Sequence, residues 1–105
     1  MSDPILARFL ERMKLVSRSV QAVYIFGSRA KGTHRPDSDY DLLLVVDEGF
    51  TLKDKDALYD IVMDILLDTG RLVSLKIFKA PVFQRLRDLH TPFMRHVLTE
   101  GIKVG

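Results

Sequence analysis

Apolar residues in the first part of the chain recur at steps of three and four, the spacing of one face of a helix. They are Ile5, Leu6, Phe9, Leu10, Met13, Val16 and Val20. Ser2 or Asp3 can cap such a helix, and Pro4 suits its first turn, where a missing backbone N–H costs no hydrogen bond. The pattern therefore predicts an amphipathic N-terminal helix.

Two apolar runs follow, and each predicts a strand; the first is uninterrupted, which suits a strand buried on both faces. Residues 22–26 are strand formers that stop at Gly27. Residues 40–46 contain one charge, Asp41, and come directly after Asp39. The stretch between the two runs is rich in polar residues, glycine and proline, so we expect a loop there.

Residues 52–69 return to helical spacing, and Gly70 is well placed to end that helix. Residues 72–78 form a third apolar run and predict a third strand. Pro81 suits the first turn of a short helix, and residues 91–92 can open another. The second half of the chain is therefore predicted as helix, strand and short helices.

The predicted order is helix, strand, strand, helix, strand and short helices. Each helix has one apolar face to bury, so the natural arrangement is a small mixed β-sheet with helices packed on one side. We therefore expect an α+β fold. A chain of 105 residues without linker, repeat or low-complexity stretch should form a single domain over residues 1–105.

Composition narrows the class of protein. Hydrophobic residues make up 47% of the chain and charged residues 29%, the balance of a soluble globular domain. There is no cysteine, which excludes disulfides and thiolate metal sites, and the three histidines lack the paired spacing of zinc ligands. The start does not resemble a signal peptide and no run of about 18 apolar residues occurs, so we expect a cytoplasmic protein without a membrane span.

Charge is unevenly distributed, although the net charge is only +2. In the predicted helix over residues 52–69, aspartates repeat at every fourth position: Asp56, Asp60, Asp64 and Asp68. Like charges at this spacing cost about 0.2–0.5 kcal/mol per pair in an isolated helix. The row is either a solvated face or a docking stripe for a basic partner surface. Direct nucleic acid binding is not expected, because the chain has no dense basic stripe with interleaved aromatic residues.

The segment after the first predicted strand has the chemistry of a phosphate-binding turn. A strand that ends in Gly27-Ser28 and turns into a helical stretch presents unpaired backbone N–H groups. The missing side chain of Gly27 lets a phosphate approach the backbone, and the Ser28 hydroxyl can donate to the same oxygens. Arg29, Lys31 and Arg35 can neutralise phosphate charge, or they belong to a solvated loop.

Asp39 and Asp41 are the candidate metal ligands. Residues two apart in a strand share a face, so the two carboxylates would lie side by side and repel each other. A cation between them removes that repulsion, and Mg²⁺ is a hard ion that takes carboxylate and phosphate oxygens together. The alternative is that both are capping or turn residues at the solvated start of the strand.

These segments resemble the minimal nucleotidyltransferases of the DNA polymerase β-like nucleotidyltransferase superfamily. That family's signature is Gly-Ser, a spacer of about ten residues, and Asp-x-Asp; residues 24–32 and 36–42 are similar to its phosphate-binding turn and its metal-binding strand. The resemblance implies that Ser28 helps to hold a nucleoside triphosphate, usually ATP. It also implies that Asp39 and Asp41 bind the Mg²⁺ that activates the α-phosphate.

One feature departs from the family. Its catalytic members usually carry a third carboxylate on the next strand, whereas residues 72–78 contain no acid and Ser74 or Lys76 stands in that place. Three interpretations remain open. The enzyme works with fewer metal contacts, another acid substitutes, or the chain binds nucleotide without turnover.

The leading functional hypothesis is an enzyme that transfers AMP from ATP to a hydroxyl of a partner protein. So short a chain is not expected to contain an acceptor pocket, so a partner or a second copy in a homo-oligomer should supply it. The resemblance implies an antitoxin paired with a helical HEPN toxin. The alternative is a catalytically weakened nucleotide-binding module that neutralises its partner by contact alone. Transfer to a small molecule such as an aminoglycoside would need a further domain.

Overall fold

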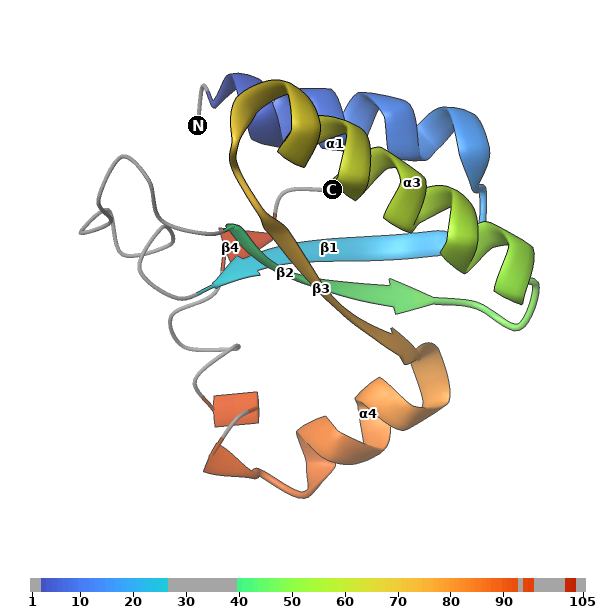
Figure 1. The fold of residues 1–105 in the computed structure, drawn as a ribbon. Helices are drawn as coiled ribbons and strands as arrows, with labels where there is room; N and C mark the ends of the chain where they lie inside the picture. The colour runs from blue at the N-terminus through green and yellow to red at the C-terminus, as the bar shows by residue number, and fades with distance from the viewer. Residues whose placement is uncertain (1–2, 27–39, 93, 96–101, 104–105) are drawn as a thin grey trace.

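The computed structural model describes residues 3–26, 40–92, 94–95 and 102–103. This part of the chain contains both helices and strands (Figure 1). In chain order they are α1 (Pro4–Val16), β1 (Val20–Phe26), β2 (Tyr40–Val46), α3 (Leu52–Thr69), β3 (Val73–Lys79), α4 (Ala80–Asp88) and β4 (Ile102–Lys103). None of the helices in these ranges is both long and apolar enough to cross a bilayer.

The four strands form one mixed sheet in the order β3-β2-β1-β4. Strand β1 pairs antiparallel with β2 and with β4, whereas β2 and β3 run parallel. Parallel neighbours need a long crossover, and α3 supplies it. The predicted α+β class with a small mixed sheet is confirmed.

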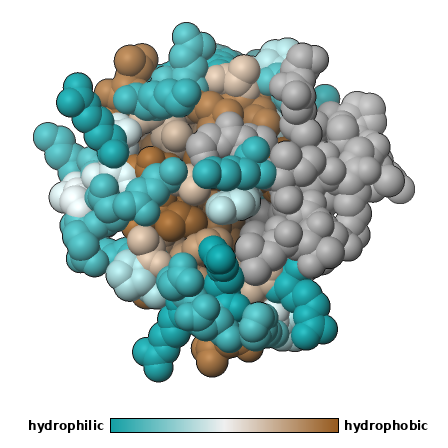
Figure 2. Space-filling model, turned by 180° about the vertical axis from the view of Figure 1, so that it is seen from behind, coloured by the Kyte–Doolittle hydropathy of each residue, from teal (hydrophilic) through white to brown (hydrophobic). Residues whose placement is uncertain are grey.

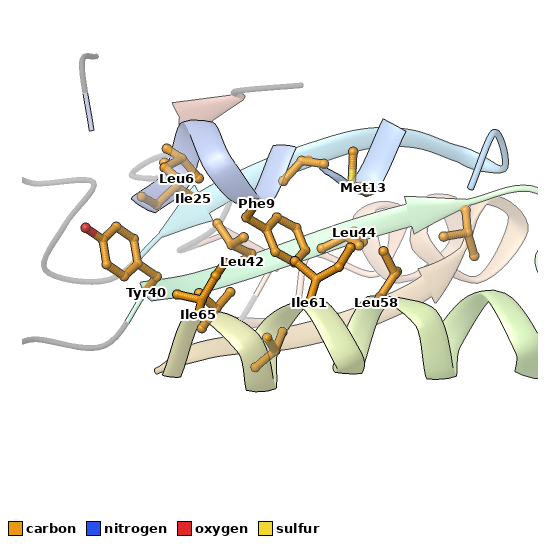
Figure 3. Packing of buried hydrophobic residues seen from close by; sticks show 14 residues of the cluster. Leu6, Phe9, Met13, Ile25, Tyr40, Leu42, Leu44, Leu58, Ile61 and Ile65 are labelled. Carbon is orange, nitrogen blue, oxygen red and sulfur yellow. The ribbon is translucent and has the colours of Figure 1, made fainter. Parts of the chain in front are cut away.

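Helices α1 and α3 lie together on one face of the sheet (Figure 1). The main apolar cluster fills the space between them and the sheet, with Phe9 from α1, Leu42 and Leu44 from β2, and Leu58 and Ile65 from α3 all fully buried (Figure 3). The two long helices therefore pack on one side, as predicted, whereas the prediction is wrong for the short helix α4, because β2 is apolar on both faces.

The short helix α4 adds a layer on the opposite face of the sheet (Figure 1). A second cluster forms there from Leu43 and Val45 of β2, Phe83 of α4 and Met94. The ring of Tyr24 on β1 stacks on Phe83 at a centroid distance of 5.9 Å. Viewed from behind, hydrophobic surface at the centre is edged by projecting hydrophilic residues (Figure 2).

Helix α1 begins as predicted but ends earlier. Asp3 is its N-cap, with one carboxylate oxygen accepting from the backbone N–H groups of Ile5 at 3.0 Å and Leu6 at 3.2 Å. The helix ends at Val16, which is 41% exposed, and Ser17 is already extended. Val20 belongs to β1, so its inclusion in the helical pattern is wrong; the 3–4 spacing continues by coincidence into a strand residue.

Helix α3 spans the 52–69 range that its pattern predicts. Thr51 and Asp54 form a capping box at the N-terminus, each side chain bonding the other's backbone N–H at 3.2 Å. At the C-terminus, Gly70 adopts the left-handed conformation with φ +73°, which glycine reaches without a Cβ penalty. Local capping chemistry thus fixes both ends of α3.

The elements after α3 are also close to prediction. Strand β3 is shifted by one residue from the predicted 72–78 range. Helix α4 begins one residue before Pro81. In the segment that residues 91–92 were expected to open, the Thr91 hydroxyl accepts from the backbone N–H of Met94 at 3.2 Å, as a helix cap does.

Candidate functional site

Asp41 lies at the start of β2, on the face of the sheet opposite to α1 and α3. The preceding residue, Tyr40, is 3% exposed and belongs to the cluster beneath those helices. Strand alternation turns the next side chain to the other face, where Leu43 and Val45 pack against α4. Asp41 itself is only partly buried, whereas every other residue of β2 is buried.

The strand register places the end of β1 beside Asp41. Phe26, the last residue of β1, pairs with Asp41 across the antiparallel ladder. Strand β1 therefore ends directly beside Asp41, and β2 begins at Tyr40. The residue that precedes the Gly-Ser motif in the sequence thus lies beside the last residue of the Asp-x-Asp motif.

On its other side, Asp41 is paired in register with Ser74 of β3. The next residue on the same face, Leu43, is paired with Lys76. In-register neighbours of parallel strands share a face, so the prediction that Ser74 and Lys76 lie on the Asp41 face is confirmed. Of the two, Ser74 is the direct neighbour of Asp41, and an acid at position 74 would stand closest to its carboxylate.

The other predicted site residues lie outside the described residues: Gly27, Ser28, Arg29 and Asp39. The described donors fit a hard cation, because the Asp41 carboxylate and the neighbouring Ser74 hydroxyl both offer oxygen. Within the described ranges, no three histidine or acidic side chains gather as a metal-binding group. Of the predicted pair Asp39 and Asp41, the described residues include only Asp41, which lies beside Ser74.

Sequence reasoning missed a contact that adjoins this site. The hydroxyl of Tyr40 donates to the Asp3 carboxylate, with distances of 2.7 Å to Oδ1 and 2.6 Å to Oδ2. Asp3 was expected only as a helix cap. The sequence signal that could have indicated this contact is a tyrosine in a strand of mainly aliphatic residues, because a buried tyrosine hydroxyl needs a hydrogen-bond partner.

The acidic row on α3 has two different environments. Asp68 pairs with Arg8 of α1 at 2.6 Å, and Asp64 pairs with Arg12 at 2.9 Å. These two aspartates therefore pair with the neighbouring helix, although their side chains remain 62% and 52% exposed. The remaining members of the row, Asp56 and Asp60, are also exposed.

A family model and two curated proteins match this chain. The model described as "Polymerase beta, Nucleotidyltransferase" matches residues 10–104. Two proteins of Methanocaldococcus jannaschii, provisionally named protein adenylyltransferases, are similar to it. One is 30% identical over 90 residues, covering 86% of this chain and 84% of its own length. The other is 29% identical over 82 residues, covering 78% of this chain and 75% of its own length.

Solved structures share the fold at lower identity. A toxin-antitoxin crystal structure with AMP-PNP has a TM-score of 0.57 at 21% identity, over 92% of this chain and 69% of that one. A mutant of the MntA-HpeT toxin-antitoxin has a TM-score of 0.60 at 22% identity, over 95% of this chain and 71% of that one. At such identities the likeness concerns the fold alone.

Proposed function

This chain belongs to the polymerase beta nucleotidyltransferase family, and we propose that it transfers AMP from magnesium-bound ATP to a hydroxyl of a partner protein. The observation that carries the proposal is the position of Asp41. Asp41 stands where β1 ends and β2 begins, so the residue before the Gly-Ser motif lies beside the last residue of the Asp-x-Asp motif. A triphosphate bound by the turn would lie beside the carboxylate.

The proposed roles follow the chemistry of each residue. Gly27 and Ser28 hold phosphate oxygens through backbone N–H groups and a hydroxyl, and Arg29 adds positive charge. Asp39 and Asp41 hold Mg²⁺, which, when bound, withdraws charge from the phosphate oxygens. The predicted pairing of Asp39 with Asp41 rests on strand alternation continuing one step beyond Tyr40.

The proposed reaction is a displacement at the α-phosphorus of ATP. The acceptor oxygen forms a bond to the α-phosphorus, and the bond from that atom to the bridging oxygen of the β-phosphate breaks. Pyrophosphate leaves with the electron pair, and the acceptor's proton passes to water. The residues of this chain orient the triphosphate so that the acceptor attacks opposite the leaving group.

Two observations support a protein as the acceptor. The similar proteins of M. jannaschii are named as protein adenylyltransferases, and two structures of the same fold are toxin-antitoxin complexes. The resemblance of the motifs to minimal nucleotidyltransferases implies an antitoxin with a helical HEPN toxin as partner. We propose a cytoplasmic pair of this kind. A second copy of this chain is the alternative source of the acceptor surface.

A second candidate function is nucleotide binding without efficient transfer, with the partner neutralised by contact. The observation that favours it is the direct pairing of Asp41 with Ser74, a hydroxyl at the place where a third carboxylate would stand closest. Fewer acidic ligands hold a second metal ion less well, and a second ion is what lowers the pKa of an acceptor.

Radiolabelled ATP separates the two functions. The chain is incubated with Mg²⁺ and the protein encoded next to it, once with ATP labelled at the α-phosphate and once with ATP labelled at the γ-phosphate. Transfer of AMP should label the neighbour from the α-phosphate only, and the Asp41→Asn variant should not label it. Tight nucleotide binding without label on the neighbour supports the binding module, and label from the γ-phosphate contradicts nucleotidyl transfer.

A further inference from the structure

Tyr40 is the residue between the two proposed metal ligands, and its side chain has a buried ring with a polar end. The ring lies at one end of the main apolar cluster, with its oxygen pointing past the end of that cluster (Figure 3). Its backbone N–H donates to the carbonyl of Leu72 at 2.9 Å, which ties the first residue of β2 to the chain entering β3. The start of β2 is thus held from one side by backbone pairing.

The Tyr40 hydroxyl ties the same residue to a second element. It donates to the Asp3 carboxylate, 37 positions earlier in the chain, at 2.6–2.7 Å. The carboxylate also accepts from the first N–H groups of α1, through Ile5 and Leu6. One side chain therefore caps α1 and holds the ring of Tyr40, so the N-terminus of α1 and the start of β2 are fixed together.

We propose that Asp3 and Tyr40 form a clamp that positions the Asp41 carboxylate for metal binding. The proposal rests on the proposed function, since it takes Asp41 as a ligand. Side chains of adjacent strand residues point to opposite faces, so fixing the ring of Tyr40 on the α1 face fixes the direction of Asp41 on the other. Asp3 and Tyr40 are positioning residues, because their contact lies on the face opposite to Asp41.

The physical reason for a clamp is the position of Tyr40 at a strand end. Terminal residues of a strand open more readily than central ones, since fewer neighbours hold them. A metal site requires its ligands in a narrow range of geometry, and Mg²⁺ demands nearly ideal octahedral geometry. Outer-shell partners that orient ligands typically contribute about 10–100-fold to metal affinity or activity.

The test removes the hydroxyl and leaves the ring. Tyr40→Phe should raise the Mg²⁺ concentration needed for half-maximal ATP binding by about tenfold, measured by calorimetry. Excess Mg²⁺ should restore ATP binding, because the ligands are present and only less well oriented. Without metal, amide hydrogen exchange at residues 40 and 41 should be faster in the variant. A purely structural role would lower thermal stability but leave the Mg²⁺ midpoint unchanged.

Asp3→Ser tests the clamp from its other side. Serine is also a good helix cap, so α1 should stay capped while the shorter side chain loses the bonds to Tyr40. It should reproduce the Mg²⁺ shift even if Tyr40→Phe folds poorly. Tyr59→Phe is the matched control, since it removes an exposed tyrosine hydroxyl from α3, outside the proposed site, and it should leave the midpoint unchanged.

Asp41→Asn separates failure of the clamp from failure of the proposed function. If Asp41→Asn abolishes Mg²⁺-dependent binding while Tyr40→Phe and Asp3→Ser leave the midpoint unchanged, the clamp alone is overturned. If Asp41→Asn binds Mg-ATP as the unmodified chain does, Asp41 is not a ligand and both proposals fall. A shift in both clamp variants, with restoration by Mg²⁺, supports the clamp.

Discussion

Asp41 is the one charged side chain in β2. The other residues of this strand are Tyr40 and five aliphatic residues, and all of them are buried. A carboxylate beside so much apolar surface is costly unless charged or polar partners compensate it. Its position was predictable, because alternation in an apolar run decides which face it takes. Which of Ser74 and Lys76 is its direct neighbour was not predictable, since the register between β2 and β3 depends on how α3 packs across them.

The first prediction concerns the proposed ligand pair. Asp39→Ala combined with Asp41→Ala should abolish Mg²⁺-dependent ATP binding in calorimetry. Thermal unfolding without metal should be unchanged or shifted upwards, because repulsion between two like charges is removed. Asp60→Ala, an exposed aspartate on α3, is the control and should bind normally. Unchanged binding in the double variant would remove the basis of the proposed function.

A second prediction uses the register of β3. Ser74→Asp places an acid directly beside Asp41 and should increase Mg²⁺-dependent AMP transfer if the missing third carboxylate limits the reaction. Lys76→Asp, one pair further along, should increase it less. Without metal, Ser74→Asp should lower thermal stability, and Mg²⁺ should restore it. Full activity in the unmodified chain, with no gain in either variant, would mean that no third acid is needed.

Among the elements, those with local end signals were predicted best. Helix α3 matches its predicted range because Thr51 and Gly70 fix its ends through contacts within a few residues. The end of α1 was missed because Val20 continues the helical phase although it pairs with Val46 in the sheet. The bond between Tyr40 and Asp3 joins distant parts of the chain and leaves no local pattern.

Strand β2 also explains why the sheet has helices on both faces. In its apolar run, odd-numbered and even-numbered residues alike are buried, which is typical of a strand covered on both faces. Helices α1 and α3 cover one face, so the other face needs a cover too, and α4 packs there through Phe83. The signal for this extra layer in the sequence is that apolar and polar residues do not alternate in β2. The sequence of α4 gives no such signal.

The third prediction belongs to the pair of helices α1 and α3. Replacing Asp64 and Asp68 with lysine should lower the free energy of unfolding by about 1 kcal/mol, since each exposed ion pair contributes about 0.2–1 kcal/mol and the lysines would face arginines. Salt should reduce the difference. The matched variant with lysine at Asp56 and Asp60 should lose little stability. Equal losses in urea unfolding would contradict a specific role for the two pairs.

On the scale of the whole molecule, the aspartate row of α3 and two arginines of α4 lie on opposite faces of the sheet. The aspartate row lies on α3, in the layer above the sheet, while the last turn of α4 below it carries Arg85 and Arg87, both exposed. Asp64 and Asp68 form ion pairs with arginines of α1. Asp56 and Asp60 are therefore the members of the aspartate row that we expect to contact a basic partner. Apolar Tyr59 and Met63 on the same helix are also exposed, at 41% and 52%.

This arrangement gives the last prediction, which again rests on the proposed protein partner. If a basic partner surface meets α3, replacing Asp56 and Asp60 with lysine should weaken the complex by about tenfold or more and reduce its sensitivity to salt. Mg-ATP affinity should not change, because Asp41 lies on the face of the sheet opposite to α3. Asp88→Lys on α4 is the control for a charge change on the opposite layer. Calorimetry with the purified neighbour measures the affinity, and an unaltered value in the double variant would exclude α3 as the docking surface.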